Sequence, residues 1–281
     1  MPLIEQTPER YLRSPRLEPV ADGGALLHVL AWAGSDEECV LRFDLSDDGS
    51  VRGEAGSTDH SAAIMTWAPG VSHPINDPLA ELAAEHQGWR AEVRHEGARS
   101  TVLVAPPSGG EFVVWTAFGI AVAPCISAAP GGAWVAFHHD VREDTGVPDI
   151  AKWIAVRFVD MKGTVFEPSG PMTDRDRDLE GEEQGFEFPA IVVGDDGAID
   201  LFGRGSHTMY RQRLNARGFA AREQIDDPHW GCRGRRVTAA RLANGTTLAA
   251  WRARKGIRIE SFDQPSGGAP ELVEAKVEVG E

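Results

Sequence analysis

The sequence predicts an all-β fold, a β-propeller of four-stranded antiparallel blades, and three observations lead to this prediction. Short strand–turn–strand units that carry an arginine recur about every 54 residues along the chain. A second hairpin with a glycine-rich turn precedes most of these units. Four antiparallel strands that repeat every ~40 to 60 residues are typical of propeller blades.

The arginine-containing unit consists of a short strand, a turn with glycine and another strand. It occurs at residues 40–51, 154–165, 209–220 and 256–268, with Arg42, Arg157, Arg213 and Arg258. Arg94, in AEVRHEG, supplies a fifth member in this interpretation. An arginine between apolar neighbours on a strand is expected to point outward, and a charged channel lining is the alternative.

The preceding hairpins have turns that favour tight strand reversal. These turns are Gly23-Gly24, Gly131-Gly132, Asp196-Gly197 and Asn244-Gly245. An aromatic residue stands near the end of each second strand: Trp32, Phe137, Phe202 and Trp251. Each repeat therefore holds four strands, in the order first hairpin and then arginine unit.

We predict one propeller domain over residues 1–281 with five blades, and six blades as the alternative. The alternative arises because residues 52–120 are irregular and bear an insertion. That stretch contains an extra hairpin at 100–115 and a helix-like piece, PLAELAAEHQ, at 78–87. The C-terminal ELVEAKVEV alternates at period two, and we expect it to close the ring with the N-terminal blade.

The charge balance excludes several classes of partner. The chain has 28 Lys and Arg against 43 Asp and Glu, a net charge of −15, which disfavours binding to nucleic acid or an anionic membrane. Residues 112–137 carry no charge, but Pro124, Pro130 and two glycines interrupt them, so several strands fit better than a membrane helix.

The cellular location is predicted from the N-terminus and the cysteines. MPLIEQTPERYLRSPR has no apolar core, so we expect no secretory signal, and three cysteines make a disulfide framework improbable. These features favour a cytoplasmic protein. The richness in Ala, Gly and Arg suggests a bacterial source with a GC-rich genome.

Two repeats resemble propellers of known families. The fourth repeat, at 188–219, resembles the repeats of bacterial fucose-binding propeller lectins in its P-x-V…DG run and its F-x-R-G sequence. The third repeat, PCISAAPGGAWVAFHHDVRED, is similar to blades of sialidase-like propellers and of propeller polysaccharide lyases. The lyase resemblance implies β-elimination on a uronate.

The candidate site lies where the long connections of a propeller gather, at the mouth opposite the tight turns. The residues there with catalytic chemistry are His138, His139, Asp140, His207 and Tyr210. Those suited to binding a substrate are His60, Arg142, Arg204, Trp230 and Arg252. If the fold is right, these groups converge on one mouth from different blades.

These residue types fit acid–base chemistry. Histidine titrates near neutral pH, and a carboxylate such as Asp140 orients it or raises its pKa. Arg204 or Arg252 could hold a substrate carboxylate, and Tyr210 could transfer a proton. The structural alternative is that His138 and His139 are one inward and one outward residue at a strand end.

Further alternatives are structural. His207 and Arg204 are compatible with purely structural roles, Trp230 with core packing, and the acidic run at 174–187 with a solvated loop, a lid or a cation site. We expect no cofactor and no redox group. A divalent metal is the alternative, because His60, His138, His139 and Asp140 are acceptable ligands without a dedicated motif.

The favoured function is an enzyme with a single acid/base site at the mouth, because the His-His-Asp cluster occurs in one repeat only. Its chemistry would be of lyase, cyclase or hydrolase type, on a small metabolite, an oligosaccharide or a uronate. An enzyme of specialised metabolism is one version of this hypothesis. A carbohydrate-binding lectin and a protein-interaction scaffold are the alternatives. The sequence says nothing of the oligomeric state.

Overall fold

The computed structural model describes most of the chain, and every regular element in the described part is a β-strand. The described residues are 3–6, 11–21, 23–32, 38–59, 82–97, 99–141, 151–169, 187–205, 208–226, 237–253, 255–275 and 277. Within these ranges no helix is long and apolar enough to cross a membrane.

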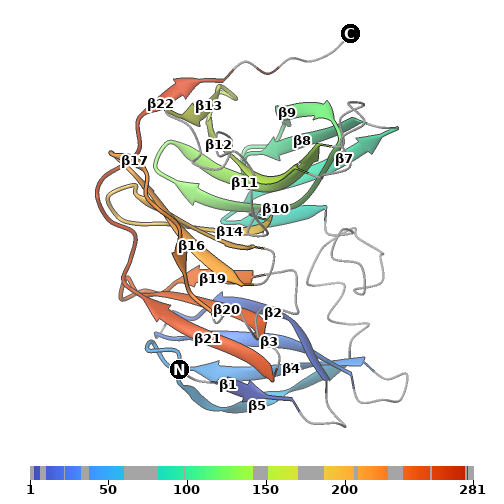
Figure 1. Ribbon diagram of the computed structural model, residues 1–281, viewed down its shortest axis with the longest axis vertical. Helices are drawn as coiled ribbons and strands as arrows, with labels where there is room; N and C mark the ends of the chain where they lie inside the picture. Colours follow the sequence, from blue (N-terminus) through green and yellow to red (C-terminus); the bar gives the residue numbers. More distant parts are fainter. Residues whose placement is uncertain are drawn as a thin grey trace.

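The described strands form five antiparallel sheets, each of which is one blade (Figure 1). Blade 1 contains β2 (Tyr11–Pro19), β3 (Ala25–Trp32), β4 (Glu38–Leu45) and β5 (Val51–Asp59). Blade 2 contains β6 (Ala83–His86), β7 (Trp89–Glu96), β8 (Arg99–Ala105) and β9 (Phe112–Phe118). Blade 3 contains β10 (Ile120–Ala129), β11 (Gly132–Val141), β12 (Ala151–Asp160) and β13 (Val165–Pro168). Blade 4 contains β14 (Glu187–Val193), β15 (Ile199–Arg204), β16 (Met209–Asn215) and β17 (Gly218–Phe219), with β18 (Glu223–Gln224) also on β16. Blade 5 contains β19 (Val237–Arg241), β20 (Thr247–Ala253), β21 (Gly256–Phe262) and the N-terminal β1 (Leu3–Glu5). Five blades, the favoured prediction, are thus confirmed.

The first strands of successive blades pack against one another around a common centre. β6 contacts β10, β10 contacts β14, β14 contacts β19, and β19 contacts β2. Apolar clusters fill the boundaries between blades 5 and 1, 2 and 3, 3 and 4, and 4 and 5. This arrangement is the propeller that the repeats predict, because each blade buries both faces only by stacking against its neighbours.

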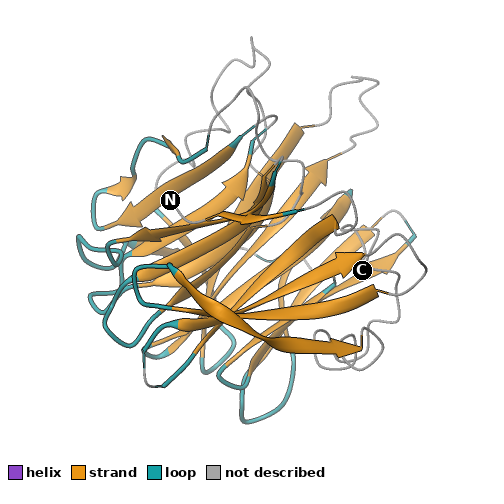
Figure 2. Cartoon of the chain, turned by 90° about the horizontal axis from the view of Figure 1, so that it is seen from below, coloured by secondary structure: helices purple, strands orange, loops and turns teal. Residues whose placement is uncertain are grey.

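A five-residue turn recurs at four hairpins, and two of these contain the predicted glycine turns Asp196-Gly197 and Asn244-Gly245. The turns are 46–50, 160–164, 194–198 and 242–246, and in each the fourth residue is a glycine with φ between 82° and 90°. A side chain accepts a backbone N–H within each turn, as the Asn244 amide does from Thr246 at 2.9 Å. The turns gather at one end of the strands (Figure 2).

In the irregular stretch at 52–120, residues 52–59 belong to β5 of blade 1 and residues 83–118 form blade 2. Two predictions for this stretch are corrected. The predicted helix-like piece is wrong for residues 83–86, which are the strand β6 and pair with β7 through a two-residue turn. Arg94 lies on the second strand, β7, and not on the third strand that carries the other arginines. The hairpin at 100–115 is confirmed as β8 and β9.

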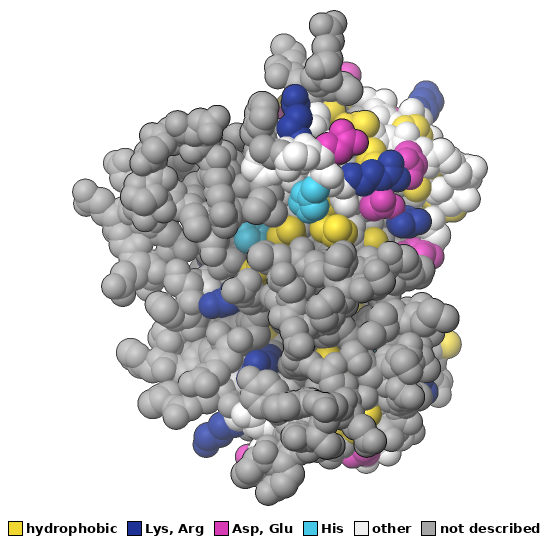
Figure 3. Space-filling model, turned by 90° about the vertical axis from the view of Figure 1, so that its right-hand side faces the viewer, with side chains coloured by type: hydrophobic (Ala, Val, Ile, Leu, Met, Phe, Trp, Pro, Cys, Tyr) yellow, Lys and Arg dark blue, Asp and Glu magenta, His cyan; other side chains and the backbone are white. Residues whose placement is uncertain are grey.

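Blades 1 and 2 differ from the other blades in how their neighbouring faces pack. The described strands of these two blades do not pack closely against each other. The outward face of β7 carries an ion-pair ladder instead of apolar residues, with Arg90 to Glu92 at 2.7 Å and Arg94 to Glu111 at 2.7 Å. Figure 3 shows basic and acidic side chains side by side on this side of the molecule.

The two chain ends complete blades 5 and 3. β1 pairs with β21, and the C-terminal β22 (Leu272–Glu274) pairs with β13 at the edge of blade 3. The expectation that the C-terminal strand joins the N-terminal blade is therefore wrong. The period-two pattern of the C-terminal segment agrees with its packing, because the alternate residues Ala275 and Val277 contact the apolar cluster of blades 2 and 3.

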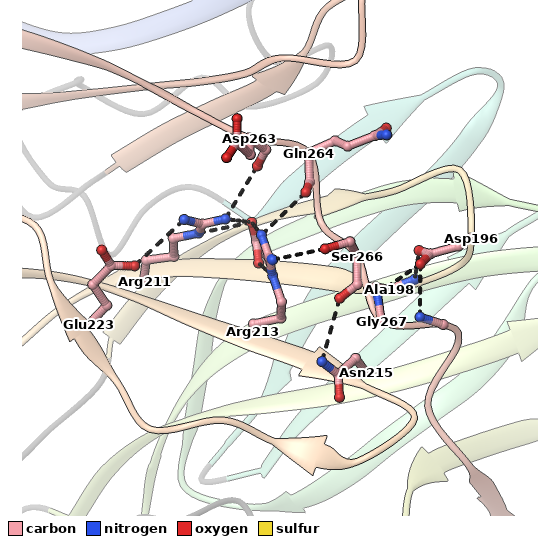
Figure 4. Close-up of polar contacts among 12 residues, drawn as sticks. Asp196, Ala198, Arg211, Arg213, Asn215, Glu223, Asp263, Gln264, Ser266 and Gly267 are labelled. Carbon is pink, nitrogen blue, oxygen red and sulfur yellow. Dashed lines mark hydrogen bonds and ion pairs between the residues drawn. The ribbon is translucent and has the colours of Figure 1, made fainter.

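The segment between β21 and β22, residues 263–271, crosses blade 4, and we call it the strap (Figure 1). Asp196 accepts hydrogen bonds from the backbone N–H groups of Gly267 and Gly268, both at 2.8 Å. Arg211 and Arg213 donate to strap carbonyls at 3.3 Å (Figure 4). The strap therefore joins blades 5, 4 and 3.

Asp200 holds both of these arginines in place. Its carboxylate is fully buried and accepts hydrogen bonds from Arg213 at 2.8 and 3.1 Å and from Arg211 Nε at 2.9 Å. A buried carboxylate is stable only when paired in this way. The pairing also raises the pKa of Arg213, chiefly through its hydrogen bond to Asp200.

The substitution Asp200→Asn is expected to destabilise the protein by about 3–5 kcal/mol, because it leaves two guanidinium groups without their buried counter-charge. Urea unfolding measures this change. Asp195→Asn is the matched control, since Asp195 pairs with Arg241 but is 71% exposed, and it should cost less than about 1 kcal/mol. Equal losses in the two variants would contradict the role given to Asp200.

Candidate functional site

Many of the connections that the sequence predicts at the mouth lie outside the described residues. Four of the predicted site residues lie outside them too: His60, Arg142, His207 and Trp230. The acidic run at 174–187 also lies outside, except for the backbone of Glu187. Asp140 is described only through its backbone, which pairs with Ile120 and Lys152. The roles predicted for these residues stay predictions.

His138 and His139 lie on β11 but point to opposite sides of blade 3. The His138 ring stands edge-on to Phe188 of blade 4, with ring centres 4.8 Å apart. The His139 ring stands edge-on to Trp115 of blade 2, at 4.3 Å. Both side chains are buried, at 2% and 5% exposure. Because successive residues on a strand face opposite sides, the structure does not bring the two rings together.

The surroundings of His138 contain unusual backbone. The pairing of β10 shifts register between Val122 and Cys125, and that of β14 between Glu187 and Ala190. In each strand a residue with positive φ precedes a proline at the shift. These residues are Ala123, with φ 50°, and Phe188, with φ 53°. Both are buried, and they form one cluster with Val122, which pairs opposite His138. The bulge in β14 thus places Phe188 against the histidine.

Tyr210 lies at the same boundary as His138. It is on β16, opposite Gly203, and packs on the apolar cluster between blades 3 and 4. The Arg222 guanidinium lies over its ring at 5.7 Å. Cys125 packs on the same cluster, and burial raises the pKa of its thiol to about 12. Because that thiol stays protonated at neutral pH, it is not a nucleophile here.

The two described arginines of the predicted site face other boundaries. Arg204 ends β15 two residues after Phe202, which packs between blades 4 and 5. Arg252 is on β20 two residues after Ala250, which packs between blades 5 and 1. By strand alternation the arginines share those faces. Burial lowers the pKa of Arg252. Among the described candidates, His138 and Tyr210 are the two that lie at the same boundary, on β11 and β16.

Asp226 is a buried carboxylate that the sequence interpretation did not single out. It accepts a hydrogen bond from Trp251 Nε1 at 2.7 Å and forms an ion pair with Arg258. The Thr208 hydroxyl donates to its backbone carbonyl at 2.7 Å. The Asp226-Asp227-Pro228 sequence marks a strand end, but nothing in it distinguishes a buried aspartate from a solvated one.

Among the described side chains, no three His, Cys, Asp or Glu residues gather closely enough to hold a metal ion. The predicted ligand His60 lies outside the described residues. At the boundary of blades 3 and 4 the structure therefore describes a buried imidazole, a phenol and apolar side chains. An imidazole can take and return a proton near neutral pH.

Comparison with known proteins assigns no family to the chain. No protein-family model and no curated protein matches the chain. Similar solved structures include an endo-arabinase from Bacteroides thetaiotaomicron, with 13% identity and a TM-score of 0.47 over 95% of this chain and 99% of that chain. Another is a GH43_1 enzyme from Xanthomonas citri, with 13% identity and a TM-score of 0.46 over 97% of this chain and 93% of that chain.

A third is an exo-1,5-alpha-L-arabinanase from a bovine ruminal metagenomic library, with 15% identity and a TM-score of 0.46 over 96% of this chain and 100% of that chain. None of the three is described as a sialidase, a lectin or a lyase, so they do not support the resemblances drawn from the third and fourth repeats. At such identities and TM-scores, the likeness assigns no family, substrate or site residue to this chain.

Replacing Trp251 with Phe is expected to cost about 2–4 kcal/mol of stability, because it removes volume and takes a hydrogen bond from the buried Asp226 carboxylate. Thermal or urea unfolding measures the loss. Trp134→Phe is the control, since Trp134 is 4% exposed and packs on Phe158 without a hydrogen bond to a described residue. If both variants lose the same stability, the Asp226 contact contributes nothing.

Proposed function

We propose that the chain is an enzyme that performs acid–base chemistry of hydrolase type on an oligosaccharide or a small metabolite, at the boundary of blades 3 and 4. One observation carries the proposal: the buried His138 lies against Phe188, and Phe188 and its cluster neighbour Ala123 are both buried residues in left-handed backbone. Non-glycine residues in that conformation are costly, and they cluster at active sites. Bulges next to active sites re-aim side chains in the same way.

The histidine is specific to blade 3. Near the end of the second strand, the residue that faces the following blade is His138 in blade 3, Arg204 in blade 4 and Arg252 in blade 5. A lectin with repeated sites would repeat the same polar residue at such positions. Of these three side chains only the imidazole of His138 exchanges a proton near neutral pH, which favours one acid/base site.

The proposed roles follow from proton affinity. His138 acts as the general acid or base, since an imidazole can both take and return a proton near neutral pH. Tyr210 is the second proton-transferring group. In hydrolysis, one group protonates the leaving oxygen while another takes a proton from the attacking water. Elimination or cyclisation would use the same pair on a carbon acid.

The remaining predicted residues complete the proposed site from the mouth. Asp140 would orient a histidine, and the binding of substrate would involve residues of the neighbouring connections: His60, Arg142, His207, Trp230, Arg204 and Arg252. His139 has a secondary role in this proposal, because it faces blade 2. A cytoplasmic location is proposed with it. The scaffold alternative has less support, since among the described residues only Val51, Met161 and Val273 are exposed large apolar side chains.

The proposal is tested by measuring turnover in variants of two adjacent histidines. His138→Gln is expected to lower turnover by about 10²–10⁴-fold, the usual worth of a general acid or base, and to remove one limb of the pH profile. His139→Gln is the matched control, because it removes an equally buried imidazole on the opposite face of β11. It should change turnover less than tenfold.

The substrate panel is arabino- and xylo-oligosaccharides, uronate-containing oligosaccharides and small metabolites. Release of reducing ends reports hydrolysis, and absorbance of an unsaturated uronate reports elimination. The proposal is wrong if His138→Gln keeps full turnover on a substrate that the wild type converts, or if His139→Gln loses as much.

A further inference from the structure

The turn at 242–246 in blade 5 contains an asparagine that is followed by a glycine, Asn244-Gly245. Of the three asparagines in the chain, Asn76, Asn215 and Asn244, only the last precedes a glycine. Its side chain is exposed, at the end of the molecule where the tight turns gather (Figure 2). Asparagine is a thermolabile residue type. Because glycine has no Cβ, its backbone nitrogen approaches the side-chain amide of the preceding residue without a steric clash.

Two hydrogen bonds hold the Asn244 side chain in one orientation. Its oxygen Oδ1 accepts the backbone N–H of Thr246 at 2.9 Å. Its nitrogen Nδ2 donates to the Asp47 carboxylate of blade 1 at 3.2 Å. The first contact places a donor at the oxygen that becomes negative when a nucleophile attacks Cγ, and such a donor lowers the barrier to that attack. The second contact engages the nitrogen that leaves in the same reaction.

We propose that Asn244 is a site of spontaneous deamidation, with water as the co-reactant. The backbone nitrogen of Gly245 loses its proton to hydroxide and forms a bond to Cγ of Asn244, and the bond from Cγ to Nδ2 breaks. Nδ2 takes up a proton from water and leaves as ammonia. Water then adds to one of the two carbonyl carbons of the cyclic imide and opens the ring, which yields aspartate or isoaspartate. This site is separate from the one proposed for catalysis.

Asn215, in the turn between β16 and β17, has the same side-chain geometry but precedes an alanine. Its Oδ1 accepts the backbone N–H of Arg217 at 2.9 Å, which is again two residues further along the chain. Its Nδ2 lies 3.5 Å from the carbonyl oxygen of Ser266. Asn215 is half-buried, and the residue that would supply its attacking nitrogen is Ala216.

The attacking nitrogen is hydrogen-bonded in both turns. Gly245 donates to the carbonyl of Leu242 at 3.0 Å, and Ala216 donates to that of Gly268 at 3.1 Å. Each of these bonds has to open before the nitrogen reaches Cγ, so both reactions are slowed. Alanine adds a further barrier, because its Cβ crowds the approach. Asn215 is therefore the matched comparison for the effect of the glycine.

Deamidation acts on the contact between blades 5 and 1. The tight turn of blade 1 lies against blade 5, since a Cβ on Gly49 would come within 3.2 Å of Ile259. The hydrogen bond from Asn244 to Asp47 crosses this boundary. The aspartate product replaces the donor with a second carboxylate, so that attraction becomes repulsion between like charges. Because both groups are exposed, salt screens this repulsion.

Peptide mass spectrometry of the full chain, incubated at mildly alkaline pH, measures deamidation at each asparagine. We expect the reaction at Asn244 to be at least about tenfold faster than at Asn215, which corresponds to a barrier about 1.4 kcal/mol lower. The product is expected to be a mixture of aspartate and isoaspartate, since water attacks either carbonyl of the imide. The proposal is wrong if Asn244 deamidates no faster than Asn215.

The effect on the fold is measured with Asn244→Asp, which produces one of the two products directly. Its melting temperature should fall by about 1–3 °C at low salt, as expected for two exposed like charges in a chain of this length. The loss should disappear at high salt. Asp47→Asn in the Asn244→Asp background supplies an amide donor opposite the new carboxylate and should restore the melting temperature.

Asn215→Asp is the matched control, since it adds a carboxylate to a turn that does not contact Asp47. Asp47→Asn should leave the melting temperature of this control unchanged. If Asp47→Asn fails to restore the Asn244→Asp variant, or changes both variants equally, the effect assigned to the contact between blades 5 and 1 is wrong. Neither test measures turnover, so the result is independent of the function proposed for His138.

Discussion

The buried pairing of Asp200 with Arg211 and Arg213 is the interaction on which the closed arrangement of blades 3, 4 and 5 depends. It fixes two guanidinium groups so that their remaining donors reach the strap. β22 has only three residues, and a strand so short contributes little alone. Its pairing with β13 is therefore stabilised by the anchors on blade 4. Burial of the carboxylate makes these contacts worth more than surface ion pairs.

The rigid stacking of the blades positions the candidate site. β10 and β14 touch at the centre, and a bulge in each strand turns its residues off the regular register. Phe188 can adopt its left-handed backbone only because the packing around it compensates for the cost. That conformation sets the ring against His138. A shift of blade 4 would therefore change the environment of the imidazole without any change in blade 3.

The sequence predicted the turns and the number of blades, because glycine and Asx residues act locally. It failed where the outcome depended on long-range contacts. Leu272–Glu274 reads as a strand, but its partner depends on where the strap crosses. The sequence around Arg94 resembles the arginine unit of the other repeats, but Arg94 lies on the second strand of its blade and not on the third. The opposite faces of His138 and His139 follow from strand alternation alone, whereas the burial of Asp226 is set by Trp251 and Arg258, which follow it in the chain.

Comparison of blades 1 and 4 shows how one repeat position serves two purposes. In both blades a third-strand arginine stands directly opposite a second-strand residue. In blade 4 the buried Asp200 carboxylate neutralises the arginine charge inside the protein, and this ion pair stabilises the fold. With His28 the residue opposite the arginine is itself basic, and the carboxylate that pairs with it, Glu18, comes from β2 at 3.1 Å. Glu18 is 57% exposed, so its ion pair contributes less to stability than the buried Asp200 pair does. One exchange of residue type at a repeated position thus decides whether a blade has a buried ion pair there or a surface one.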